Sequence, residues 1–151
     1  MDVGFKNASG NFSLRAAALI IQDNKLLVAK RQDYDCYYTV GGGVRQNEPT
    51  DKAVLRECFE ETGHSYQIHR LVFVQERFFK IEDRNHHEVV FFYLMQDDGF
   101  QIQSGVNTDQ QSEQLFWIPI EKLGGINLVP AFLKMALQDI PGDVTRVVSY
   151  E

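Results

Sequence analysis

Hydrophobic and polar positions follow two periods along this chain, one typical of strands and one typical of helices. Turn-forming Gln22-Asp23-Asn24 separates two apolar runs and predicts a hairpin, and charged Glu82–Asn85 predicts a loop between two longer runs. The runs expected to form strands, rich in β-branched and aromatic residues, are 14–21, 25–31, 37–40, 68–79, 87–95, 100–102 and 115–118, with a final edge strand at 144–148.

Two segments have helical spacing instead. Residues 49–62 begin with Pro49, which suits the first helical position, and Gly63 suits the residue just past the end. Residues 129–138 carry apolar side chains three and four apart and predict a second helix. Many strands with two helices predict an α+β sandwich rather than a regular alternation of strands and helices.

Composition narrows the class of protein. A length of 151 residues favours a single domain, 1–151, and 44% hydrophobic with 24% charged residues is typical of a globular chain. The net charge of −6 argues against general nucleic-acid binding, which needs a basic surface. The apolar runs are too short to span a membrane, and the first residues do not resemble a secretory signal. We therefore expect a cytoplasmic protein without a membrane or nucleic-acid partner.

The candidate chemistry lies on the first predicted helix. Glu57, Glu60 and Glu61 are spaced i, i+3 and i+4, so they share one face of that helix. Like charges at this spacing destabilise an exposed helix by about 0.2–0.5 kcal/mol per pair, and a divalent cation would turn their repulsion into attraction. Arg56 stands four residues before Glu60 and can bind its carboxylate. The alternative interpretation is a solvated acidic face.

The residues around this helix resemble the Nudix box. The box is a glycine, five residues, Glu, seven residues, Arg-Glu, two residues, Glu-Glu, one residue and a second glycine. This sequence matches at Gly42, Glu48, Arg56, Glu57, Glu60, Glu61 and Gly63. Cys58 and His64 stand where the family usually has aliphatic residues, and neither change removes a metal ligand of the family.

The resemblance implies an α/β/α sandwich with a mixed central sheet and a pyrophosphohydrolase that uses Mg²⁺ or Mn²⁺. Glu48 would be an auxiliary metal ligand, and Arg56 would orient the carboxylates. By position, the metal ligands implied are Glu57, Glu60, Glu61 and the carbonyl of Gly41.

The proton acceptor has several candidates. Glu61 and Glu57 come from the box, while in some members the base is a glutamate of a later loop, for which Glu113 is the candidate here. The competing interpretation of Glu113 is a solvated loop charge. Catalytic roles are thus expected among Glu61, Glu57, Arg56 and Glu113.

The substrate is specified less sharply. Gly42 and Gly43 allow close approach of a ligand, and Arg31 would contact phosphate or be an ordinary surface charge. Tyr34, Tyr37 and Tyr38 would stack on a base or pack in strands. His86-His87-Glu88 is interpreted as a boundary between loop and strand, not a metal tract.

Elimination of the markers of other subfamilies favours a small nucleotide-type substrate, namely a nucleoside triphosphate or a modified nucleotide. Nucleotide-sugars, dinucleoside polyphosphates and a non-catalytic nucleotide sensor remain alternatives. Prenyl diphosphate isomerisation, known in some relatives, lacks an assignable cysteine–glutamate arrangement here. A homodimer is also expected from the resemblance.

Overall fold

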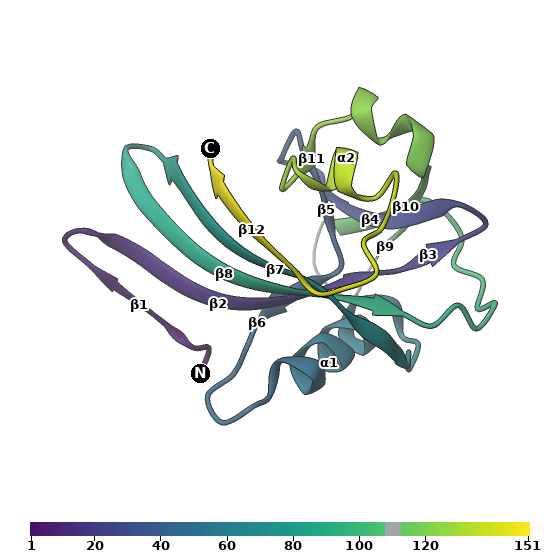
Figure 1. Cartoon of the computed structure of the whole chain (residues 1–151), viewed down its shortest axis with the longest axis horizontal. Coiled ribbons are helices and arrows are strands. Elements are labelled where there is room, and N and C mark those ends of the chain that lie inside the picture. Colours follow the sequence, from purple (N-terminus) through teal and green to yellow (C-terminus); the bar gives the residue numbers. More distant parts are fainter. Residues whose placement is uncertain (108–112) are drawn as a thin grey trace.

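Two mixed or antiparallel sheets dominate the computed structural model, which describes residues 1–107 and 113–151 (Figure 1). The first sheet has the order β1-β2-β8-β7-β12, with β6 paired to β2. Its β2–β8 and β7–β12 pairs are parallel and the others antiparallel. Its strands are β1 (Gly4–Asn7), β2 (Gly10–Leu19), β6 (Gly41–Gly43), β7 (Ile68–Ile81), β8 (Arg84–Met95) and β12 (Thr145–Tyr150).

The second sheet has the order β11-β5-β4-β10-β9, with β3 paired to β4. Only the β11–β5 pair is parallel among its described pairs. Its strands are β3 (Ile21–Gln22), β4 (Lys25–Arg31), β5 (Tyr37–Thr39), β9 (Val106–Asn107), β10 (Glu113–Pro119) and β11 (Leu128–Val129). Strands 37–40, 115–118 and 144–148 of the sequence prediction correspond to β5, β10 and the edge strand β12.

Helices cover the sheets on opposite sides. Helix α1 (Thr50–Thr62) packs buried Ala53, Val54 and Cys58 against β2, while η1 (Ile120–Gly125) and α2 (Leu133–Ala136) lie near the second sheet (Figure 1). Pro49 is extended and caps α1 rather than occupying its first turn. The α+β sandwich is thus confirmed, with its strands divided between two sheets. Neither helix of the described chain is long and apolar enough to cross a bilayer.

The predicted hairpin of 14–21 with 25–31 is wrong for most of its length. Only Ile21 and Gln22 pair with β4, around a turn in which Asp23 and Asn24 have positive φ. The preceding residues form β2, which pairs with β8 in the other sheet. Because side chains of β2 are buried on both faces, its apolar run does not reveal which strand it joins.

The second helix is far shorter than the predicted 129–138. Val129 is extended and pairs with Tyr38, because the residue before a proline is disfavoured from helical conformation. The apolar spacing of this segment is explained by Leu133 and Leu137, which lie four residues apart and are both buried in the core. Residues 100–102 form no strand either, since Phe100 instead stacks on His64.

Strands β7 and β8 extend to a tight turn at Glu82 and Asp83, whose positive φ values of 50° and 63° suit a two-residue hairpin loop. His86 and His87 therefore lie inside β8, not at a loop boundary. Their side chains point to opposite faces: His86 stacks on Phe79, while His87 contacts Phe12 and Phe78.

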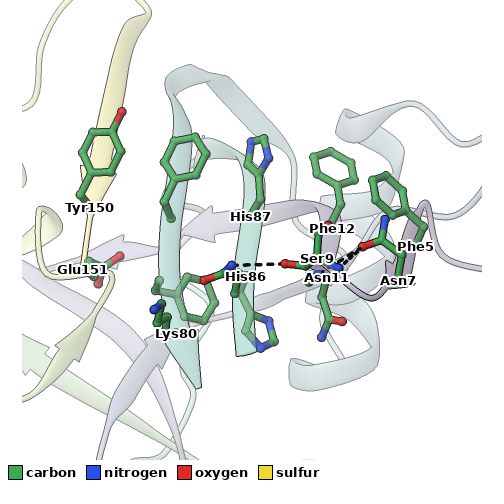
Figure 2. A pocket seen from close by; sticks show the side chains of 14 residues that line it. Phe5, Asn7, Ser9, Asn11, Phe12, Lys80, His86, His87, Tyr150 and Glu151 are labelled. Atoms are coloured by element: carbon green, nitrogen blue, oxygen red, sulfur yellow. Dashed lines mark hydrogen bonds between the residues drawn. The ribbon is translucent and has the colours of Figure 1, made fainter. Parts of the chain in front are cut away.

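An aromatic row crosses the far end of the first sheet, and Figure 2 shows most of its members on one face. Neighbouring ring centroids lie 4.4–5.4 Å apart along the row. These contacts tie five strands together, from β1 to β12. The members in order are Phe5, Phe12, His87, Phe78 and Tyr150.

Packing between the sheets predicts a large stability effect at Phe73, which is 2% exposed and makes edge contacts with Phe92 and Phe132. Phe73→Ala is expected to lower the free energy of unfolding by about 3–5 kcal/mol, through lost burial and a cavity. Phe59, 56% exposed on α1, is the matched control, and Phe59→Ala is expected to change it by less than about 0.5 kcal/mol. Urea denaturation checks both values, and equal losses would contradict this description of the core.

Candidate active site

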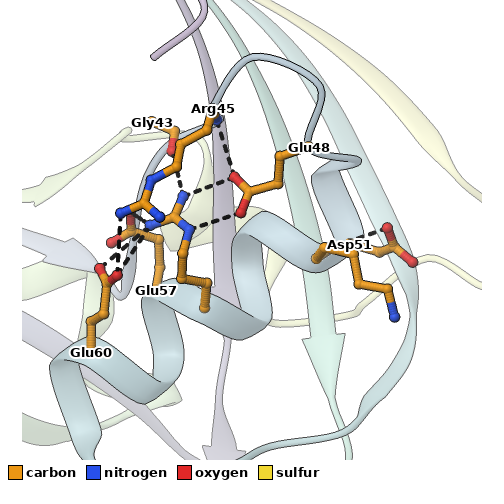
Figure 3. A network of polar contacts seen from close by, with 8 residues as sticks. Gly43, Arg45, Glu48, Asp51, Glu57 and Glu60 are labelled. Carbon is orange, nitrogen blue, oxygen red and sulfur yellow. Dashed lines mark hydrogen bonds and ion pairs between the residues drawn. The ribbon is translucent and has the colours of Figure 1, made fainter. Parts of the chain in front are cut away.

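Arg56 is the centre of the polar network on α1 (Figure 3). Its Nε and Nη2 atoms donate to the two oxygens of Glu48 at 2.8 and 2.9 Å, a bidentate pair. Nη1 donates to Glu57 at 2.8 Å and lies 3.4 Å from Glu60, while Nη2 also donates to the carbonyl of Gly43. One guanidinium thereby holds three carboxylates against the strand that precedes the helix.

These contacts shift the pKa values of the carboxyl groups in this network. The bidentate bond from Arg56 lowers the pKa of Glu48 to about 2, and the backbone N–H of Arg45 also donates to that carboxylate. Burial raises the pKa of Glu57, an effect that Arg56 opposes. Arg45 adds a second cation 3.6 Å from Glu60. Glu48 is therefore bound to Arg56 and positions it.

Glu61 occupies a different environment, deeper than the other acids. Its side chain is 5% exposed, and it accepts a hydrogen bond of 2.9 Å from the backbone N–H of Gly41. Burial first, and then the charge of neighbouring Glu113, raise its pKa well above the usual value of a carboxyl.

Glu113 is buried beside Glu61 and is no solvated loop charge. It begins β10 in register with Arg31 of β4, and its Oε2 accepts a hydrogen bond from the hydroxyl of Tyr38. Its Oε1 is buried without a hydrogen-bond partner among the described residues. Glu113 thus contributes a second buried carboxylate from a strand far away in the sequence.

The three glycines before the helix form strand β6, which pairs with β2. A Cβ at Gly42 would lie 2.5 Å from the carboxyl group of Glu57. A Cβ at Gly41 would lie 2.5 Å from the carbonyl oxygen of Ala16 and 2.8 Å from the Cα of Ala17. These positions lack side chains because β2 and α1 both approach them closely.

The acidic residues line one cavity of about 560 Å³. Asp2 and four glutamates line it, together with the backbone of Gly41 and Gly42; the glutamates are Glu57, Glu60, Glu61 and Glu113. Carboxylate oxygens are the donors that Mg²⁺ and Mn²⁺ prefer, so the donor set fits such an ion. Among the described residues no three potential ligands already converge on one point, because Arg56 holds Glu57 and Glu60.

A second cavity of about 290 Å³ adjoins the first, with Arg15, Arg31, Tyr34 and Tyr38 lining both. Arg31 pairs with Asp33 at 3.3 Å and lies 4.8 Å from the ring centre of Tyr34. The predicted site residues therefore all lie in or beside the two cavities. Arg15 and Gln75 were not identified from the sequence as lining residues. Each is a polar residue within an apolar strand, and this pattern could have indicated them.

The close contacts of β6 generate a prediction at Gly41. Because the methyl group of Gly41→Ala meets backbone atoms of β2, we expect a loss of about 1–3 kcal/mol in the free energy of unfolding. Gly124→Ala is the matched control, since a Cβ there meets nothing within 4 Å. Denaturation in a chelator measures stability apart from metal binding, and a Gly41→Ala protein as stable as its control would contradict the described contact.

Comparison with known proteins agrees with this arrangement. The chain is 36% identical over 84 residues to diphosphoinositol polyphosphate phosphohydrolase 3-alpha of Mus musculus, covering 53% of this chain and 49% of the relative. It is 29% identical over 114 residues to diphosphoinositol polyphosphate phosphohydrolase 2 of Rattus norvegicus, covering 73% and 60%. The chain thus spans about half the length of the mouse relative.

The solution structure of the E. coli ORF135 protein matches with a TM-score of 0.61 at 25% identity, over 91% of this chain and 99% of that one. A family model, described as the NUDIX domain, matches residues 12–138, and these residues include β2, α1, β7, β8 and β10. The chain therefore belongs to the NUDIX domain family.

Proposed function

We propose that this chain is a divalent-metal-dependent hydrolase that cleaves a phosphoric anhydride bond of a nucleotide. The observation that carries the proposal is the single cavity into which α1 and β10 bring Glu57, Glu60, Glu61 and Glu113. Nudix hydrolases generally use divalent metals, and the two buried carboxylates of Glu61 and Glu113 repel each other unless a cation joins them. Buried Glu113 Oε1, unpartnered among the described residues, further supports this proposal.

Glu57, Glu60 and Glu61 are the residues proposed to hold Mg²⁺ or Mn²⁺, with the carbonyl of Gly41 as a further ligand. When bound, the metal neutralises phosphate oxygens and lowers the pKa of water. Glu48 is bidentately bound to Arg56, so we assign it a positioning role rather than direct ligation. Arg56 in turn keeps the carboxylates of Glu57 and Glu60 close together.

We propose Glu61 as the group that takes the proton from the attacking water. Its carboxylate is buried beside Glu113 and is fixed by the backbone N–H of Gly41, so it is positioned to accept a proton. Water oxygen then forms the new bond to phosphorus, the anhydride P–O bond breaks, and the leaving phosphate oxygen departs with the electron pair. Tyr38 holds Glu113 through its hydroxyl and so keeps the pair of carboxylates in place.

A nucleoside triphosphate or modified nucleotide is the substrate class that we favour. The adjoining cavity has Tyr38, Val90 and Phe92 on its walls, surfaces suited to a flat base. Diphosphoinositol polyphosphates, from which the mouse and rat relatives take their names, are the second candidate because of the sequence identity. A ring bearing many phosphates needs several free cations, whereas Arg77 of this cavity is engaged by Glu88 and Glu151.

A substrate panel tests the proposal. Nucleoside triphosphates, nucleotide-sugars, dinucleoside polyphosphates and diphosphoinositol polyphosphates are incubated with the protein and Mg²⁺, and released phosphate or pyrophosphate is measured. We expect turnover of the triphosphates, loss of activity with excess EDTA and recovery with Mg²⁺. Binding throughout the panel without turnover of any member would instead establish a nucleotide-sensing module.

Glu61→Gln removes the proposed proton acceptor while preserving the shape of the side chain. We expect kcat to fall about 10²- to 10⁴-fold, because proton transfer by a positioned group contributes that much. Substrate Kd in Ca²⁺ is expected to change much less. Exposed Glu121 on η1 provides the control Glu121→Gln, which should retain wild-type kcat. A fully active Glu61→Gln protein would remove this carboxylate from the mechanism.

The remaining features of the proposal come from composition and resemblance. We propose one domain over the whole chain, supported by the family match over residues 12–138. Cytoplasmic location, a homodimer and the lack of a nucleic-acid partner stay predictions.

A further inference from the structure

Gln75 is a buried polar side chain that the proposed hydrolysis does not use. It lies in the middle of β7, is 0% exposed, and donates from Nε2 to the hydroxyl of Ser149 at 3.1 Å. Its Oε1 atom is buried and has no hydrogen-bond partner among the described residues. Because buried polar atoms are nearly always paired, this free acceptor needs an explanation.

The cavity beside Gln75 supplies one. Gln75 lines the 290 Å³ cavity, together with Val90 and Phe92 of the first sheet and Tyr38 and Pro130 of the facing segments. These walls are apolar or aromatic, so a ligand that enters between the sheets meets a surface that favours a flat ring. The free oxygen of Gln75 is then the hydrogen-bond acceptor available to that ring.

The strand register places Gln75 at a defined distance from the acids. Arg15 of β2, Val90 of β8 and Gln75 of β7 are register partners in one row, and Gly43 of β6 pairs with Arg15 at its other end. Arg15 lines both cavities, whereas Gln75 lines only the second. Two strand spacings, about 10 Å, therefore separate Gln75 from the residue that borders the acidic cavity. Gln75 faces the end of a ligand remote from its phosphates.

Three polar groups near this end are already engaged, namely Arg77, Glu88 and the amide nitrogen of Gln75. Arg77 and Glu88, one row further along β7 and β8, lie 3.5 Å apart, and Arg77 also binds Glu151. The amide nitrogen of Gln75 is held by Ser149. Among the described residues of this wall, the Gln75 oxygen is therefore an acceptor without a partner, and it accepts a hydrogen bond rather than donating one.

Resting on the proposed function, we infer that Gln75 reads the base of the nucleotide by accepting a hydrogen bond from its exocyclic amino group. Adenine and cytosine present an N–H donor on the edge opposite the sugar, whereas hypoxanthine and uracil present a carbonyl oxygen there. A carbonyl would face the Gln75 oxygen with no proton between them. The site therefore selects adenine and cytosine nucleotides.

Matched nucleotide pairs test this inference, because ATP differs from ITP, and CTP from UTP, only in this exocyclic group and in the proton on the adjacent ring nitrogen. We expect wild-type kcat/KM to favour the amino member of each pair about tenfold, the value of one hydrogen bond in a water-excluded site. Gln75→Met keeps the side-chain length and removes the acceptor, so both ratios should fall to within about twofold of unity. Gln67→Met, a change of the same type at an exposed residue, should keep the wild-type ratios.

A binding measurement separates this inference from the proposed hydrolysis. Calorimetric Kd values for AMP against IMP, and for CMP against UMP, require no turnover. Preference for the amino forms with no hydrolysis of any triphosphate would support the role of Gln75 and overturn the hydrolase proposal. Hydrolysis with equal treatment of both members of each pair would overturn the role of Gln75 alone. Absence of binding would also overturn the role of Gln75. If Gln75→Met fails to fold, equal Kd values for both members of each pair with the wild-type protein would still overturn that role.

Discussion

The guanidinium of Arg56 holds together groups that would otherwise repel one another. Glu48, Glu57 and Glu60 all carry negative charge within reach of it, and its remaining donor capacity is directed to the carbonyl of Gly43. With a point charge such as lysine in this position, the planar bidentate contact to Glu48 would be lost. This side chain links the helix, the glycine strand and the acidic cavity to one another.

The two groups of carboxylates in the site are balanced by different means. Glu48 and its neighbours on the surface of α1 are compensated by a cation that is part of the protein. For Glu61 and Glu113, deeper in the cavity, the donors found among residues 1–107 and 113–151 are neutral, namely the N–H of Gly41 and the hydroxyl of Tyr38. The first group is therefore held in place by Arg56, while the second is open to a cation that enters the cavity.

The sequence could predict the local part of this site. The spacing, with Pro49 and Gly63, predicts a helix over 49–62, which the structure has at Thr50–Thr62, and the common face of three glutamates follows from helix geometry alone. Contacts made across the sheets could not be predicted in this way. Glu113 reaches Glu61 only because β10 pairs with β4, and Gln75 reaches its cavity only because β7 and β8 carry it to the row of Arg15. Likewise, apolar spacing predicted a helix over 129–138, but Val129, which precedes Pro130, lies in a strand instead.

The ladder between β10 and β4 sets which chemical group enters the acidic cavity. Glu113 faces Arg31 and Leu115 faces Ala29, so the acid and the core leucine share a face of β10. A shift of that ladder by one residue would exchange the faces and present the amide of Gln114 in place of the acid. Deleting or inserting one residue within β10 is thus equivalent to a chemical substitution in the cavity. The burial of Leu115 keeps the ionisable group where it is.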